Sequence, residues 1–142
     1  MATTWAVVDT VVNSDCVEAC PFEATHLIVC ACYQINEETR VRAGRIYLNE
    51  VVAEKSGEDT QYGLKTLQTL DVDGIFDCKW NTNSALNPPH PNLGTVDSNG
   101  CLKMFELAST ESNSYELVHK TTNRISEQEN NMGLSLDWNC RL

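Results

Sequence analysis

Basic residues are scarce in this 142-residue sequence, in which 10 Lys plus Arg stand against 20 Asp plus Glu, a formal net charge of −10. None of the basic residues precedes Arg40. Binding to the phosphate backbone of nucleic acids needs clustered Lys and Arg, and an anionic membrane surface repels an acidic chain. The composition therefore argues against nucleic-acid and membrane partners and favours cationic ones.

Long hydrophobic runs are also lacking. The most apolar uncharged run, Ala24–Asn36, has 13 residues and contains His26 and Gln34, whereas a membrane-spanning helix needs about 20 apolar residues. The N-terminus has no positively charged start of the kind that opens a signal peptide. We therefore expect a cytoplasmic protein, and a length of 142 residues fits one domain.

The seven cysteines do not form a recognisable disulfide or zinc pattern. Their number is odd, and the spacings Cys16-x3-Cys20 and Cys30-x-Cys32 differ from those of structural zinc sites. On an alternating strand Cys30 and Cys32 share a face, which fits packing between layers. We expect seven free thiols, no metal and no cofactor; the positions are Cys16, Cys20, Cys30, Cys32, Cys78, Cys101 and Cys140.

Helical periodicity is absent, and short apolar runs separated by turn residues dominate the chain. The segment 26–34 (HLIVCACYQ) is β-branched and continuous, which is typical of a strand buried on both faces. Asn99-Gly100 between two apolar runs predicts a hairpin turn. Loops are expected at 36–42, 88–91 and 127–131. The pattern predicts an all-β fold.

The chain also repeats itself. Val17, Phe76 and Leu134 occupy equivalent positions, with separations of 59 and 58 residues. Each period contains four strand-like runs, the content of one β-propeller blade, although a β-sandwich with chance alternation remains an alternative. The eight runs are 16–20, 26–34, 44–51, 63–70, 74–80, 92–97, 100–107 and 114–121.

These runs predict part of a WD-type β-propeller. Residues 16–70 would form blade one, 74–121 blade two and 132–142 the start of blade three, while 5–12 would form the closing strand of an absent last blade. A ring needs at least about four blades. The chain is therefore expected to be a truncated form of a larger protein.

Several motifs resemble the N-terminal part of the WD-repeat diphthine methylesterases, which are also catalogued as diphthine methyltransferase homologues. The motifs are 17–21 (VEACP), 31–34 (ACYQ), 73–80 (DGIFDCKW) and 133–139 (GLSLDWN), and the resemblance covers residues 5–142. Ala19 departs from it, because the family leads us to expect a larger aromatic residue there.

The resemblance implies a carboxylic ester hydrolase that removes the methyl ester of diphthine methyl ester on elongation factor 2, in diphthamide biosynthesis. Elongation factor 2 would be the partner, and aromatic and acidic side chains would suit the trimethylammonium group of the substrate. The alternative is a non-catalytic WD-repeat scaffold that binds proteins. We expect the chain by itself to lack esterase activity.

No catalytic residue can be assigned from the sequence, although several candidates exist. Ser135 stands in a Gly-x-Ser-x-Asp context that lacks the second glycine of a nucleophile elbow. His26 and His119 lie in predicted strands, where a structural role is favoured, and His90 lies in a Pro-rich loop.

Two pairs of residues stand at equivalent positions of the repeats. Trp80 and Trp138 both follow predicted inner strands, which favours a repeated structural role. Glu18 and Asp77 either line a central channel or satisfy turn hydrogen bonds.

Overall fold

The computed structural model describes residues 4–56, 59–82, 91–128 and 131–139. The described part contains no α-helix, so the all-β prediction is confirmed. One 3-10 turn, η1 (Phe22–Ala24), precedes the second strand. The strands are β1 (Ser14–Ala19), β2 (Leu27–Ile35), β3 (Arg42–Ser56), β4 (Asp59–Asp73), β5 (Ile75–Trp80), β6 (Asn92–Asp97), β7 (Cys101–Ser109) and β8 (Tyr115–Arg124).

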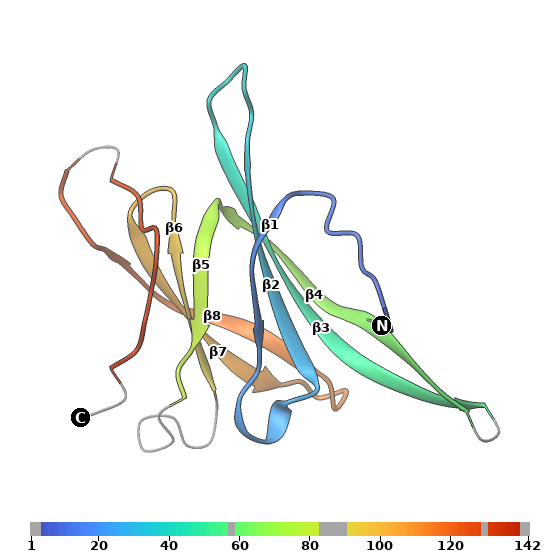
Figure 1. Ribbon diagram of the computed structural model, residues 1–142. Coiled ribbons are helices and arrows are strands. Elements are labelled where there is room, and N and C mark those ends of the chain that lie inside the picture. The colour runs from blue at the N-terminus through green and yellow to red at the C-terminus, as the bar shows by residue number, and fades with distance from the viewer. Residues whose placement is uncertain (1–3, 57–58, 83–90, 129–130, 140–142) are drawn as a thin grey trace.

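The strands form two four-stranded antiparallel sheets (Figure 1). Sheet A has the order β1-β2-β3-β4 and sheet B the order β5-β6-β7-β8, so that each strand pairs with its neighbour in sequence. Each of the eight predicted runs overlaps one strand. The β3–β4 hairpin is longer than the sequence predicts. The prediction missed its outer part because the residues there are polar and show no alternating apolar pattern.

The predicted Asn-Gly turn joins β6 to β7. Gly100 has a φ of +68°, which a side chain would make unfavourable. The carboxylate of Asp97 accepts hydrogen bonds from the backbone N–H groups of Asn99 at 2.9 Å and Cys101 at 3.0 Å. The Asp97 side chain therefore accepts the backbone hydrogen bonds of the turn, while Gly100 adopts the positive φ that the turn requires.

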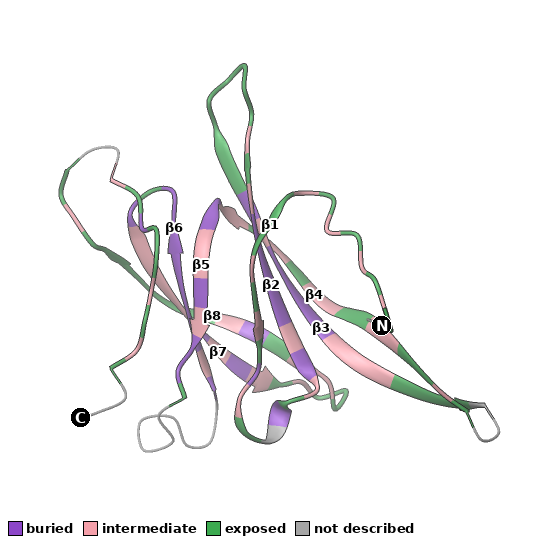
Figure 2. Cartoon of the chain, viewed as in Figure 1, coloured by how far each residue is buried: buried purple, intermediate pink, exposed green. Residues whose placement is uncertain are grey.

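The larger of two apolar clusters among the described residues lies between the two sheets. Side chains from alternate positions of both sheets meet there. Buried residues are concentrated in β2, β5 and β6 (Figure 2). Sheet A contributes Leu27, Val29, Ala31, Ile46 and Leu48, and sheet B contributes Ile75, Cys78, Trp80, Leu93, Phe105, Leu107 and Leu117. Because the core draws on both sheets, neither sheet can bury its apolar face alone.

The face of sheet A that points away from sheet B is covered in part by residues 4–13. The predicted strand at 5–12 is not present there, because a turn interrupts it. Val11 has a φ of 64°, and its N–H donates to Asp9 Oδ1 at 2.8 Å. The hydroxyl of Tyr47 donates to the carbonyl oxygen of Thr10, which ties the segment to the sheet.

The corresponding outer face of sheet B is covered by residues 131–139, which lie beside β5 and β6 (Figure 1). The strand predicted at the start of blade three, 132–142, is not formed in the described residues 132–139, because backbone N–H groups there bond to Asp97 and Asp77 and not to a neighbouring strand. The N–H of Gly133 donates to Asp97 O at 2.9 Å and that of Leu136 to Asp77 Oδ2 at 2.9 Å. The layers therefore run from residues 4–13 through sheet A and sheet B to residues 131–139.

Candidate functional site

One cluster of thiol, carboxylate and ammonium groups lies where β1 packs against β5. We name Cys16, Glu18, Asp77, Cys78 and Lys79 the inner row. The Cys78 thiol donates a hydrogen bond to Cys16 Sγ at 3.1 Å, and the Cys78 N–H donates to the same sulfur at 3.3 Å. The ammonium group of Lys79 forms an ion pair with Glu18.

Asp77 connects the inner row to residues 131–139 on the other side of β5. Its Oδ1 lies 3.5 Å from Cys16 Sγ, and its Oδ2 accepts from Leu136 N at 2.9 Å and from Ser135 Oγ at 3.3 Å. Glu18 and Asp77 therefore occupy equivalent positions in the repeat, as predicted, but their side chains make different interactions. Glu18 forms an ion pair, whereas Asp77 accepts hydrogen bonds from the neighbouring segment.

The pKa values of the two thiols in the inner row are shifted in opposite directions. The pKa of Cys16 is lowered, mainly by the hydrogen bond from the Cys78 thiol, and this outweighs the effects of burial and of the Asp77 carboxylate. The pKa of Cys78 is raised far above its ordinary value, by the hydrogen bond to Cys16 and by burial. The Glu18 carboxylate raises the pKa of Lys79.

Ser135 is placed next to a carboxylate and not next to a base of the Ser–His type. Its hydroxyl donates to Asp77 Oδ2, and its side chain is exposed. Among the described residues no histidine is hydrogen-bonded to a serine or a cysteine. An acyl-transfer nucleophile needs such a base to take its proton, and the described partner of Ser135 is the Asp77 carboxylate.

The described histidines have separate surroundings. His26 faces Glu50, with Nε2 and Oε1 4.0 Å apart, and its ring lies edge-on to Tyr115. His119 shares a hydrogen bond of 2.9 Å with the Thr122 hydroxyl on the exposed side of β8. His90 lies outside the described residues.

The six described cysteines are free thiols, and Cys140 lies outside the described part. Cys30 and Cys32 share a face, as the alternation predicts, but that face points away from sheet B and packs against Tyr47 and Val12. They therefore do not lie in the core between the two sheets. No group of three or more potential metal ligands occurs among the residues that the structure describes.

The two equivalent tryptophans have different surroundings. Trp80 is buried in the shared core, with 3% of its surface exposed. Trp138 is half-buried on the outer face of sheet B, where its indole N–H donates to Lys79 O at 3.0 Å. Only Trp80 has a place between the two sheets.

A cleft of about 660 Å³ lies between β4 and the outer strands of sheet B, and it was not predicted from the sequence. Lys103 lies in its wall and forms ion pairs with Asp73 and, at 3.0 Å, with the buried Asp97. Burial alone would lower the pKa of Lys103, but the hydrogen bonds to both carboxylates raise it. His119 also lines the cleft.

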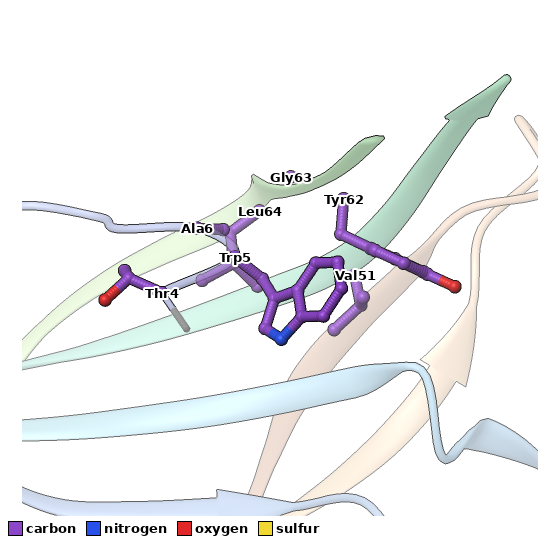
Figure 3. A pocket seen from close by; sticks show the side chains of 7 residues that line it. All are labelled: Thr4, Trp5, Ala6, Val51, Tyr62, Gly63 and Leu64. Atoms are coloured by element: carbon purple, nitrogen blue, oxygen red, sulfur yellow. The ribbon is translucent and has the colours of Figure 1, made fainter. Parts of the chain in front are cut away.

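A second cavity, of about 640 Å³, lies between the N-terminal segment and the β3–β4 hairpin (Figure 3). Trp5 and Tyr62 line it with their rings 5.4 Å apart and almost perpendicular, at 88°. The remaining lining residues are Thr4, Ala6, Val51, Gly63 and Leu64. We name this the aromatic pocket; it offers apolar and π surface and no charged lining residue among those described.

The fold and these sites define an all-β protein of two packed four-stranded antiparallel sheets. Comparison with known protein families, with curated proteins and with solved structures finds no match. No helix in the described ranges has the length and apolarity that a bilayer crossing requires.

Proposed function

We propose that the two sheets are successive blades of a WD-type β-propeller. The support is that contacts between residues about 60 apart join each layer to the next. The inner strand of sheet A meets β5 through Cys16 and Asp77, which are 61 residues apart, and β5 meets the next segment through Asp77 and Leu136, which are 59 residues apart. A propeller requires such repetition, because each innermost strand neighbours the next around the axis.

The outward faces support the same proposal. Val17 on β1 has 60% of its surface exposed, and Leu134 has 64% exposed. In a ring, an adjacent blade would cover each of these side chains. Two sheets do not close a ring, so further sheets, from more chain or from other copies, complete it in this proposal.

Within that ring we propose a diphthine methylesterase-like activity on elongation factor 2. The supporting observation is that the motifs that resemble the family lie where the layers contact one another. The motifs 17–21, 73–80 and 133–139 contain or adjoin the residues through which sheet A, sheet B and residues 131–139 contact one another. The substrate is a carboxylic methyl ester that also bears a trimethylammonium group.

The aromatic pocket has the chemistry to hold a trimethylammonium group. Trp5 and Tyr62 are 66% and 45% exposed, so a ligand can reach both rings. The faces of aromatic rings attract quaternary ammonium ions, by about 0.5–1 kcal/mol at exposed sites and about 2 kcal/mol when water is displaced. The net charge of −10 adds long-range attraction for a cation.

A non-catalytic scaffold is the second candidate, and one observation favours it. Within the described ranges no histidine is hydrogen-bonded to a serine or cysteine, and no group of three or more potential metal ligands occurs. Propellers support both binding and catalysis, so the fold does not decide between the two.

The deciding experiment incubates elongation factor 2 carrying diphthine methyl ester with the longest product of the gene and, in parallel, with residues 1–142. Methanol release and loss of the methyl group by mass spectrometry are measured. We expect the longest product to demethylate and the 142-residue chain to be inactive. Binding of the factor by the longest product without methanol release would support the scaffold instead.

Variants of the longest product test the aromatic pocket. We expect Trp5→Ala to raise KM about 5- to 30-fold with little change in kcat, since the interaction removed is worth about 1–2 kcal/mol. Phe22→Ala is the matched control, because Phe22 is also an exposed aromatic residue, at 41%, outside the pocket. An equal rise in KM for the two variants would show that the aromatic pocket does not bind the substrate.

A further inference from the structure

Cys16 and Cys78 bring two thiols from different sheets into direct contact. Cys16 lies on β1 and Cys78 on β5, 62 residues further along the chain, and their sulfur atoms are 3.1 Å apart. A disulfide bond has a length of about 2.05 Å. The sulfurs therefore need to approach by about 1 Å to form one.

The surroundings give the two thiols different roles. Cys16 is half-buried and its sulfur accepts two hydrogen bonds from Cys78, one from the thiol and one from the N–H. The Cys16 thiol also lies 3.3 Å from Cys78 O and 3.5 Å from Asp77 Oδ1, and donating to these oxygens favours its protonated form. The hydrogen bonds that Cys16 accepts outweigh this effect, and the pKa of Cys16 is lowered. Cys78 is fully buried and remains a thiol. Cys16 is the accessible nucleophile, and Cys78 is positioned to resolve the product.

We propose that Cys16 and Cys78 form a redox site that reacts with hydroperoxides and closes a disulfide between the two sheets. The Cys16 thiolate attacks the terminal peroxide oxygen, the O–O bond breaks, and the alkoxide that leaves takes up a proton to become an alcohol. Cys16 is now a sulfenic acid.

The second step uses Cys78. Its sulfur attacks the Cys16 sulfur, the S–O bond breaks, and hydroxide leaves with the Cys78 proton as water. In total, two thiols and one hydroperoxide give one disulfide, one alcohol and one water. The thiols are oxidised by two electrons and the peroxide is reduced by two.

The other interacting pair of described thiols, Cys30 and Cys32, lies within one strand and does not join the two sheets. Cys20 is buried, and its thiol donates to Pro21 O at 3.6 Å. Cys30 and Cys32 lie two residues apart on one strand, on the face away from sheet B. Burial raises the pKa of Cys32 to about 12, which disfavours its thiolate. Oxidation is therefore directed to the pair between the sheets.

The disulfide would fasten β1 to β5, next to the ion pair between Glu18 and Lys79. It would close a loop that contains most of sheet A, and so would prevent the two sheets from separating. In the ring proposed above, the same bond would lock two adjacent blades, but the redox site itself does not depend on that ring or on esterase activity.

The test treats the folded 142-residue chain with one equivalent of hydrogen peroxide, blocks the remaining thiols by alkylation and digests the product with trypsin. Cleavage after Arg40, Lys65 and Lys79 places Cys78 alone in the peptide 66–79 and Cys16 in the peptide 1–40. We expect these peptides to be disulfide-linked, reversibly by reductant, and titratable thiols to fall from seven to five.

Variants identify the partner, because the peptide 1–40 holds four cysteines. Cys16→Ser should abolish the link, while Cys30→Ser, a matched control in the same peptide, should leave it intact. When the chain is unfolded in urea before oxidation, the Cys16–Cys78 disulfide should form no more often than other pairings of the cysteines. The proposal is overturned if 66–79 stays unlinked in the folded wild-type chain, or if the link persists at equal yield in Cys16→Ser.

Discussion

The shared core predicts that a cavity made in sheet A destabilises sheet B. Val29 on β2 is fully buried and belongs to that core. In Val29→Ala the loss of two methyl groups removes about 1.6 kcal/mol of transfer free energy. A residual cavity of a few tens of Å³ adds roughly 1 kcal/mol, so we expect the free energy of unfolding to fall by about 2–3 kcal/mol.

Val17→Ala is the matched control, since the same atoms are removed from the strand that pairs with β2. Val17 is 60% exposed on the outward face, and the expected change in the free energy of unfolding is within about 0.5 kcal/mol. In a ring with a further blade over this face, the same substitution should cost nearly as much as Val29→Ala.

Urea denaturation measures the free energy of unfolding, and hydrogen exchange read by mass spectrometry resolves the two sheets. We expect Val29→Ala to lower the protection of the most protected amides of β2 and of β7 by the same amount, because one cooperative unit contains both sheets. If β7 keeps its protection while β2 loses it, the sheets unfold independently and the shared core does not couple them.

Three further predictions concern other positions, each measured by urea denaturation. Gly44→Ala should destabilise the chain by about 1–3 kcal/mol, because a Cβ there would lie 2.4 and 2.6 Å from the carbonyl oxygens of Asp73 and Cys32, whereas Gly63→Ala, whose Cβ would lie 3.4 Å from the nearest atom, should change little; similar values for both would refute the packing. Lys103→Met leaves the buried Asp97 carboxylate without its cation and should cost about 3–5 kcal/mol, unless Asp97 takes up a proton, which a stability that rises again at low pH would reveal. Burial raises the pKa of Cys20 to about 12 from an unfolded value near 9, so this thiol should lower the free energy of unfolding by up to about 1.4 kcal/mol per pH unit between pH 9 and 12, in addition to what Cys32 and Cys78 contribute, and Cys20→Ala should remove its share of the slope.

The strands could be predicted because their residues carry the information locally. In the segment 26–34 the β-branched run specifies a strand buried on both faces, and Asn99-Gly100 specifies the turn. The alternation in each run also placed Cys30 and Cys32 on one face. Which face meets the partner sheet is not a local property, and the alternation could not show that this face turns away from sheet B toward Val12.

The segments at the two ends could not be predicted from their apolar residues alone. Residues 5–12 have a strand-like composition, but Asp9 and a left-handed Val11 turn the chain. Residues 133–139 have strand-like alternation, yet Asp97 and Asp77 capture backbone donors that a sheet ladder would use. A strand requires a neighbour to pair with, and composition does not supply one.

The candidate sites depend on contacts between distant parts of the chain. Cys16 and Cys78 are 62 residues apart, and their contact requires β1 to lie against β5. Trp5 and Tyr62 meet only because the N-terminal segment crosses the β3–β4 hairpin. The repeat of about 59 residues was a signal for the first of these contacts, since it indicated that successive inner strands are neighbours.

An experimentally determined structure of the longest product of this gene tests the propeller most directly. The account predicts that a further four-stranded sheet covers Val17 and that residues 133–139 form the inner strand of the next sheet. A structure in which Val17 faces solvent and the two sheets form an isolated sandwich would contradict it.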